Sequence, residues 1–470
     1  MTPLLPVLII AWLGVAYVLF RKLPGPTAAL ITVIAGQLFL PEIHPGGTET
    51  GGPEPLDLPV VKFTKANTIG YALLAGSLLT DWRRWRTVRP RWFDLPMAAW
   101  CVSPFLSSVA NGNGPVGGLY EGANLMLNQT VSWGVPYWCG RLYLGDRVGL
   151  RAAAAAVVLG GLVYVPLCLI ELRLSPQLHH WVYGYHQHEF VQTVRDGGYR
   201  PMVFMEHGLM VSLWMAVAAL TAFWLWHEGV FRVVGLFGAV RVGLGWVALG
   251  LAAVVVASHS AGAALLGAGG AAALWVARRL RTAVPLWLLV LLPPAYVAAR
   301  YTEIWDGHDL VALAQEYVNR ERAESLEFRF KNEYKLVARA RERPAFGWGD
   351  SGEARVVDGG STKVVTDSMW IITAGTRGLF GLAAFLAVLM TPVVLFLRAD
   401  PPRRWTGPAD APAAVLAVAL SLYLLDHMVN AMVNPAFTLI AGGLAGAAGV
   451  LGSTAAEWPA DAGAARRYDS

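Results

Sequence analysis

The chain has 470 residues, of which 55% are hydrophobic and only 15% are charged. Soluble globular domains carry about 25% charged residues, so this composition excludes an ordinary soluble protein and indicates a membrane protein. The net charge of +5 comes from arginines in short clusters between apolar runs, which is the pattern of cytoplasmic loops. We therefore expect the lipid bilayer, and no nucleic acid, as a partner. The three cysteines fall inside apolar runs, which excludes a disulfide framework.

Apolar runs follow one another along the chain as far as residue 452. A helix needs about 20 apolar residues to cross the hydrocarbon core of a bilayer. The thirteen runs span residues 4–20, 27–40, 67–80, 93–110, 119–140, 152–171, 202–226, 242–257, 260–277, 284–299, 368–397, 411–429 and 433–452. They predict an all-α polytopic membrane protein with about 12 or 13 transmembrane helices. Residues 1–20 lack the basic segment of a signal peptide, so we expect them to remain as an anchor.

The loops between these runs alternate in their content of lysine and arginine. Basic loops stay in the cytoplasm, whereas long loops cross a membrane regardless of charge. The expected extracytoplasmic loops are 41–66, 111–118, 172–200, 258–260, 300–366 and 430–434. The chain is thus expected to divide into N-terminal transmembrane helices (1–299), a large extracytoplasmic loop (300–366), C-terminal transmembrane helices (367–452) and a disordered cytoplasmic tail (453–470).

Residues 300–366 form a long segment that a bilayer would not hold. Apolar residues recur in its middle part at i, i+4, i+8, i+11 and i+14, the pattern of an amphipathic helix. They are Leu326, Phe330, Tyr334, Val337 and Ala340. Pro344, Gly347 and Gly349 then end the helix. We expect this loop to cap a membrane-embedded cavity and to help bind a charged, lipid-linked substrate.

Arg200 and Pro201 precede an apolar run. Proline suits the first turn of a helix, so Arg200 is expected just outside a helix N-terminus. Free N–H groups, the helix dipole and a guanidinium together favour an anion such as phosphate. An interfacial arginine that only reaches toward lipid head groups has the same sequence pattern. Glu206 and His207 follow within the run and are further candidate substrate-binding residues.

Other polar residues lie near the expected extracytoplasmic side, and each has a structural alternative. Glu121, Asn124 and Asn128 share a helix face, which fits either interhelical hydrogen bonds or the lining of a hydrated cavity. Histidines cluster within residues 179–189, but their spacing matches no zinc motif, and contacts with sugars or lipid head groups fit equally well. His259 interrupts an apolar hairpin, where it is either a packing or a substrate-binding histidine.

Two acidic residues stand at the ends of apolar runs. Asp426 lies four residues before Asn430, and the two either share a helix face or cap a hairpin. Asp367 directly follows the large loop. It either caps the next helix or acts as a general base toward an acceptor hydroxyl.

Four stretches resemble motifs of one family. They are YRPMVFMEHGLM around Arg200, VVVASHSAGAALLG around His259, RFKNEYKLVARARERPAFGWG beginning at Arg329, and TDSMWIITAGTRGLFGL around Asp367. In this order they resemble the O-antigen ligase and O-antigen polymerase superfamily, bacterial inner-membrane glycosyltransferases of the GT-C type. Two positions differ from the family pattern. His259 stands where an arginine is usual, and Asp367 stands where the proposed catalytic histidine is expected.

The resemblance implies transfer of a glycan from an undecaprenyl-diphosphate-linked donor to a saccharide acceptor, such as the lipid A core. It implies that this reaction needs no metal or cofactor and takes place at the periplasmic face of the inner membrane. Arg200 and Arg329 would neutralise the diphosphate leaving group, where negative charge develops. Arg320 and Arg322, from the same loop, are further candidates for this role.

The resemblance also implies that Asp367, or otherwise His259 or His207, orients or deprotonates the acceptor hydroxyl. Other classes share the features of this chain. A transporter or flippase for polysaccharide or lipid-linked solutes also has many spans and polar residues at membrane depth, but it often carries internal repeats, and the sequence shows none. A catalytically altered relative is the third alternative, because the expected histidine is replaced by Asp367.

Overall fold

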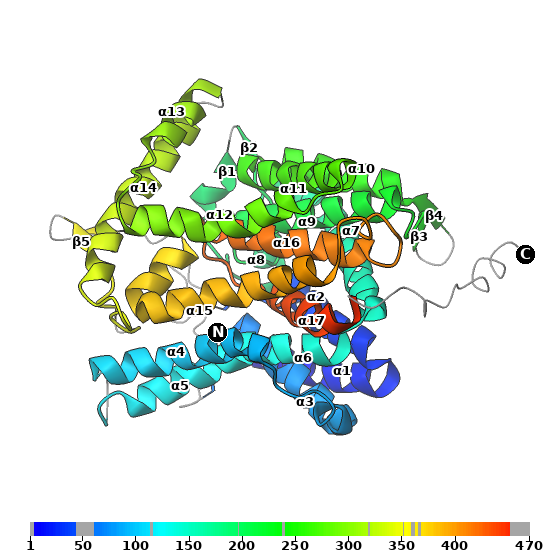
Figure 1. The fold of residues 1–470 in the computed structure, drawn as a ribbon, viewed down its shortest axis with the longest axis horizontal. Coiled ribbons are helices and arrows are strands. Elements are labelled where there is room, and N and C mark those ends of the chain that lie inside the picture. The colour runs from blue at the N-terminus through cyan, green and yellow to red at the C-terminus, as the bar shows by residue number, and fades with distance from the viewer. Residues whose placement is uncertain are drawn as a thin grey trace, which may run out of the picture.

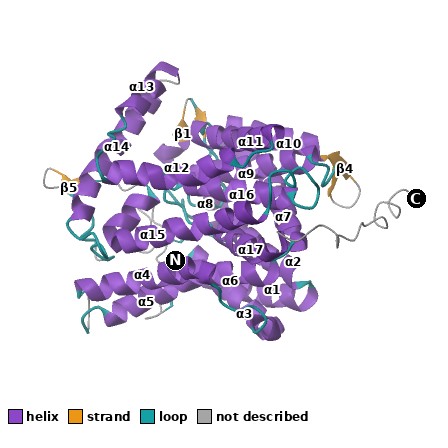
Figure 2. Ribbon diagram, viewed as in Figure 1, coloured by secondary structure: helices purple, strands orange, loops and turns teal. Residues whose placement is uncertain are grey.

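The computed structural model describes residues 4–43, 61–112, 116–195, 197–236, 240–317, 320–350, 352–358, 362–364 and 368–451. This part of the chain is almost entirely helical (Figures 1 and 2). Its helices are α1 (Leu4–Lys22), α2 (Gly25–Phe39), α3 (Lys65–Trp85), α4 (Leu95–Asn111), α5 (Leu119–Gln129), α6 (Val135–Tyr143), α7 (Arg147–Leu174), α8 (Leu178–Tyr183), α9 (Gly208–His227), α10 (Leu244–Ala257), α11 (Ala261–Leu280), α12 (Val284–Tyr301), α13 (His308–Tyr317), α14 (Arg320–Arg341), α15 (Met369–Ala399), α16 (Ala411–Asp426) and α17 (Pro435–Leu451).

The described strands form three short antiparallel hairpins. They pair β1 (Val194–Arg195) with β2 (Gly198–Tyr199), β3 (Val233–Leu236) with β4 (Val240–Gly243), and β5 (Val357–Asp358) with β6 (Thr362–Lys363). Each hairpin lies in a connection between helices, so none of them contributes to the helical core.

Each predicted apolar run contains helix. Five described helices, α7, α9, α11, α12 and α15, are long and apolar enough to cross a membrane, and α2, α10, α16 and α17 are shorter apolar helices. The expectation of an all-α membrane protein is confirmed at this level. The run 119–140 is not one regular α-helix, because α5 and α6 are separated by a π-helical turn at Thr130–Gly134. Such turns insert an extra residue into a helix and often occur at functional sites.

Hydrogen bonds join the loops into two groups. One group links expected extracytoplasmic loops through Arg195 to Glu321 (2.9 Å), Arg200 to the carbonyl of His259 (3.1 Å) and Asn111 to the carbonyl of Gly347 (2.9 Å). Lys65, at the end of another of these loops, donates to the carbonyl of Phe204 in the segment before α9 (2.6 Å). The other group joins the start of α7 to two further connections, through Arg147 to Asp410 (2.6 Å) and Arg151 to the carbonyl of Val230 (3.4 Å).

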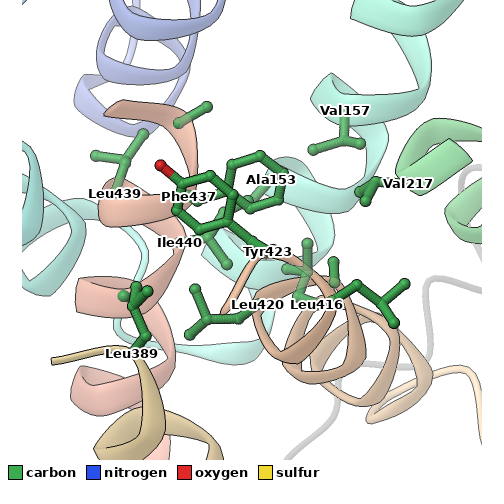
Figure 3. Packing of buried hydrophobic residues seen from close by; sticks show 14 of the residues in the cluster. Ala153, Val157, Val217, Leu389, Leu416, Leu420, Tyr423, Phe437, Leu439 and Ile440 are labelled. Atoms are coloured by element: carbon green, nitrogen blue, oxygen red, sulfur yellow. The ribbon is translucent and has the colours of Figure 1, made fainter. Parts of the chain in front are cut away.

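The core lies where α16 and α17 meet α7 and α9. Tyr423 of α16 stacks on Phe437 of α17, with ring centroids 4.1 Å apart (Figure 3). Helices α6 and α17 approach closely because Gly140 and Gly442 have no Cβ; a Cβ at either position would overlap the backbone of the other helix. In α11, Gly270 packs against α9 and α16, whereas Gly269 faces open space.

Helix α14 docks on the membrane helices through a face that differs by one residue from the prediction. Phe330, Val337 and Ala340 are buried as expected. Tyr334, however, is 58% exposed, and Glu333 lies in the contact instead, 5% exposed. The apolar pattern therefore located the helix correctly, but a buried charge sets its rotation.

Glu333 is the centre of that contact. It accepts hydrogen bonds from Arg300 (3.1 Å) and Tyr296 (2.9 Å) of α12 and from Trp370 (3.2 Å) of α15. Arg300 also donates to the carbonyl of Phe330 on α14 (3.0 Å). A buried ion pair with all of these additional hydrogen bonds holds a unique geometry, which fixes the position of α14 over the bundle.

The turn after α14 packs against a break in α15. Gly378 has φ +63° and ψ −165°, which interrupts the helix and leaves backbone groups without intrahelical partners. The turn provides partners for these groups through four hydrogen bonds. The N–H groups of Leu379 and Phe380 in α15 donate to the carbonyls of Pro344 (2.7 Å) and Ala345 (3.2 Å) in the turn. In the other direction, the N–H groups of Trp348 and Gly349 donate to the carbonyls of Gly375 (2.8 Å) and Thr376 (2.9 Å). Irregular backbone at membrane depth needs such protein partners. The break thus ties the large loop to α15.

Candidate functional site

The segment before α9 is irregular rather than helical, with a turn closed by Met205 N–H and the carbonyl of Met202 (3.0 Å), which corrects the predicted helix start at Pro201. The helix begins at Gly208, seven residues later. The buried carboxylate of Glu171 on α7 accepts the N–H groups of Met202 (2.8 Å) and Val203 (2.7 Å). A carboxylate that binds successive N–H groups competes with the helical hydrogen-bond pattern, so residues 200–207 form a separate strap across the end of the bundle.

Arg200 nevertheless lies at the N-terminus of α9. Its aliphatic side chain packs across Gly208, the first residue of the helix, where any Cβ would overlap it. The Arg200 side chain is buried, with the residue 3% exposed, and Nη2 donates to the carbonyl of His259 (3.1 Å). The backbone carbonyl of His259, in a turn with φ +52°, therefore orients this guanidinium.

His207 occupies the N-cap of α9, where its Nδ1 accepts the N–H of Leu209 (3.0 Å). Burial lowers the pKa of His207 to about 3. Nearby positive charge lowers this pKa further, and it comes from His188, Arg200, Arg329 and Arg195. The imidazole is therefore uncharged at neutral pH, and the positive charge of three arginines acts on it. We call Arg195, Arg200 and Arg329 the arginine cluster.

Arg329 reaches this cluster from α14, 129 positions after Arg200 in the chain. Its Nη1 donates to the carbonyl of Val429 in the turn after α16 (2.9 Å). Arg320 lies elsewhere, on the exposed side of α14, where it pairs with Glu324 (2.7 Å). The side chain of Arg322 and the whole of Asp367 are outside the described residues. Of the sequence candidates, the structure thus brings together Arg200, Arg329, His207 and the backbone of His259.

Glu206 faces a different environment, an open polar cavity of about 350 Å³. Glu42, Lys65, Asn128, Gln129 and Arg377 also line it. Burial raises the pKa of Glu206 to about 8; the negative charge of Glu42 adds to this effect and Lys65 opposes it. We call this space the polar cavity.

Hydrogen bonds connect the walls of the polar cavity. Lys65 is 3% exposed, and its ammonium lies 3.3 Å from the carboxylate of Glu42. Asn67 of α3 donates to Asn128 of α5 (2.7 Å), which donates to Asn124 (2.7 Å). Asn128 therefore forms an interhelical hydrogen bond and also lines the polar cavity.

Glu42, Lys65 and Arg377 were missed as candidates. Arg377 had a usable signal, since a charged residue inside an apolar run is costly and therefore a candidate for function. It lies directly before the break at Gly378 and bonds to Asp350 of the docked turn (3.3 Å). Glu42 and Lys65 had no such signal, because each stands at the edge of a run, where charge is ordinary.

The remaining polar groups form local structure. His179 accepts the N–H of Glu42 (3.2 Å), and His180 stacks on His186 at 4.8 Å. Among the residues that the structure describes, no group of three or more His, Cys, Asp or Glu side chains is arranged to hold a metal ion. Asn430 donates to the carboxylate of Asp426 (2.7 Å), which closes the turn after α16.

An apolar groove of about 810 Å³ lies among α9, α10 and α11. Small side chains such as Ala216 and Gly267 form its floor. Trp246 lies at one end, and Val256 and Ala263 lie at the other, within four residues of His259 along the chain. The groove therefore ends near the turn at His259, whose carbonyl accepts a hydrogen bond from Arg200.

Replacing Glu171 with glutamine is expected to lower both stability and any activity that depends on Arg200. An amide offers one acceptor oxygen in place of two, so either the two strap N–H groups on Oε2 or the N–H of Leu178 on Oε1 loses its partner, at about 1–3 kcal/mol each. Thermal unfolding of the purified protein would measure the loss. Glu324→Gln, at an exposed pair, is the matched control and should change stability by less than about 1 kcal/mol. Equal stability of Glu171→Gln and the control would contradict this role.

The chain was compared with protein-family models and with curated proteins, and neither comparison found a match.

Proposed function

We propose that the protein is a membrane glycosyltransferase that moves a glycan from an undecaprenyl-diphosphate-linked donor to a saccharide acceptor. In this reaction a hydroxyl oxygen of the acceptor attacks the anomeric carbon of the donor glycan. The bond from that carbon to the diphosphate breaks, and the lipid diphosphate leaves with the electron pair. The hydroxyl proton passes to a base.

The observation that carries the proposal is the arginine cluster at the N-terminus of α9. Arg200 and Arg329 come from segments far apart in the sequence, and both contribute positive charge around His207. Guanidinium groups and a helix N-terminus bind phosphate oxygens well. Charge placed where a leaving group becomes negative stabilises the transition state more than the ground state.

The apolar groove supports a lipid-linked donor. A prenyl chain in the groove would leave its diphosphate at the end near His259, next to Arg200. The large loop supports a fixed site, because the Glu333 contact and the turn at Gly378 hold it against the bundle. In this proposal the helices form about 12 or 13 spans of the bacterial inner membrane, and the loop is periplasmic.

The test uses the purified full chain with a lipid-linked glycan donor and core oligosaccharide from the host. Formation of a longer glycan together with free undecaprenyl diphosphate supports the proposal. Movement of the intact donor across vesicle membranes without glycan transfer would identify a flippase and overturn it. Deletion in the host then separates two subclasses, because a polymerase mutant lacks long chains and a ligase mutant accumulates unattached ones.

A further inference from the structure

The polar cavity adjoins the arginine cluster through two consecutive residues. His207 has extended backbone geometry (φ −150°, ψ 154°), and in such geometry neighbouring side chains point to opposite sides. His207 caps α9 next to Gly208, on which the side chain of Arg200 packs, whereas Glu206 lines the polar cavity together with Glu42 and Lys65. One short strap thus presents a side chain to each of two sites.

The two sites differ in chemistry. The arginine cluster offers hydrogen-bond donors and positive charge, which suits an anion. The polar cavity offers acceptors as well as donors, because carboxylates and amides line it beside Lys65 and Arg377. A polyhydroxylated molecule needs this mixture, since each hydroxyl donates one hydrogen bond and accepts others. A volume of about 350 Å³ also falls within the range of about 300–1,000 Å³ for small-molecule sites.

Two lining side chains have incomplete hydrogen bonding. Nε2 of Gln129 and Nη1 of Arg377 are buried donors with no hydrogen-bond partner in the part of the chain that the structure describes. An unpaired buried donor costs about 1–3 kcal/mol, and an acceptor on a ligand or an ordered water removes that cost. Both nitrogens are closed to solvent, so a sugar oxygen in the cavity would pair with either donor after its side chain turns toward the cavity.

We propose that the polar cavity binds the acceptor saccharide and that Glu206 takes the proton from its attacking hydroxyl. This inference rests on the proposed function. The donor diphosphate lies on the His207 side of the strap and the acceptor on the Glu206 side, and the anomeric carbon lies at the edge of the strap, where the two sites meet. As the acceptor oxygen bonds to the anomeric carbon, its proton moves to the Glu206 carboxylate, and the lipid diphosphate departs toward the arginines.

The charges around Glu206 predict the pH dependence of this step. Glu42, Lys62, Lys65 and Arg377 share the cavity with it, and Tyr423 approaches it from α16. Since the pKa of Glu206 is raised to about 8, the carboxylate is mostly protonated at pH 7 and becomes a base as the pH rises. The turnover rate should therefore increase through about pH 8.

The first test replaces Gln129 with leucine in the full chain. The structure predicts that the KM for core oligosaccharide rises about tenfold, as expected for one lost hydrogen bond, while the KM for the lipid-linked donor is unchanged. The melting temperature should stay equal or rise, because an unpaired donor is removed. Thr32→Val is the matched control, since Thr32 Oγ1 is likewise buried without a partner among the described residues and lies outside the cavity. An unchanged acceptor KM in Gln129→Leu would overturn the proposal.

The second test replaces Glu206 with glutamine, which preserves shape and removes titration. Turnover should fall by about 100-fold or more, the rise through pH 8 should disappear, and donor binding should persist. Retention of the wild-type pH profile would rule out Glu206 as the base. If the wild-type chain transfers no glycan, calorimetric titration with free core oligosaccharide still shows whether the polar cavity binds a saccharide. If the wild-type chain binds the oligosaccharide and Gln129→Leu weakens this binding, the cavity is a saccharide site in a protein that is not a transferase. If the wild-type chain does not bind it, the proposed site is rejected.

Discussion

Arg200→Ala is expected to reduce glycan transfer about 100- to 1,000-fold, mainly in kcat. The guanidinium is buried, held by the carbonyl of His259 and placed at the N-terminus of α9, so it is preorganised for charge that develops on the leaving diphosphate. Removal of one such preorganised donor commonly costs a factor of this size. Steady-state transfer with purified protein and lipid-linked donor would measure it.

Two variants of α14 provide a comparison for the effect of Arg200→Ala on transfer. Arg329→Ala should lower transfer about 10- to 100-fold, because it removes one charge-assisted interaction worth about 1.5–3 kcal/mol. Lys331 lies two residues further on, is 67% exposed and pairs with Glu327. Lys331→Ala should leave transfer within about twofold of wild type. Equal effects of Arg329→Ala and Lys331→Ala would show that general positive charge on the loop, and not the arginine cluster, matters.

Glu333→Leu is expected to destabilise the protein by about 3–5 kcal/mol and to lower transfer as well. The substitution leaves the buried Arg300 without its counter-charge, which is the costly way to break an internal ion pair. It also releases α14 from α12 and α15, so that Arg329 is no longer held near His207. Thermal unfolding and protease sensitivity of residues 320–350 would report the two effects.

The double variant Arg300→Met with Glu333→Leu provides the control for this prediction. Replacing both charges by apolar side chains removes the unpaired group, so most of the stability should return. Glycan transfer should recover only if the apolar pair also holds α14 in its original rotation, because that rotation places Arg329. A double variant as unstable as Glu333→Leu alone would mean that the other partners of Arg300, such as the carbonyl of Phe330, dominate the contact.

Arg200 shows why part of the site was predictable and its geometry was not. Its place before an apolar run, with proline next to it, was enough to predict an arginine near a helix N-terminus. The helix instead starts at Gly208, because Glu171 binds the N–H groups of Met202 and Val203. Glu171 lies about thirty residues earlier in the chain. Local pattern cannot include a partner at that distance.

The rotation of α14 likewise depends on a distant partner that the local sequence pattern does not include. The apolar period located the helix between Leu326 and Ala340, but it put Tyr334 in the contact. The structure puts Glu333 there, where it pairs with Arg300 and accepts hydrogen bonds from Tyr296 and Trp370, and it leaves Tyr334 exposed. Hydrophobic periodicity predicts the average direction of the buried face of a helix. A single buried charge can rotate that face by one residue.

The sequence by itself determined the all-α membrane class, since run length and apolar content are local properties that decide whether a helix can cross a bilayer. It also identified Arg200, His207 and Arg329 as charged or titratable groups in unusual places. Only the tertiary structure decided which groups meet. Glu42, Lys65, Glu206 and Arg377 come from four separate segments, and their shared cavity exists because the ends of α2, α3, α9 and α15 converge. Such convergence depends on packing across the whole bundle, which no local pattern encodes.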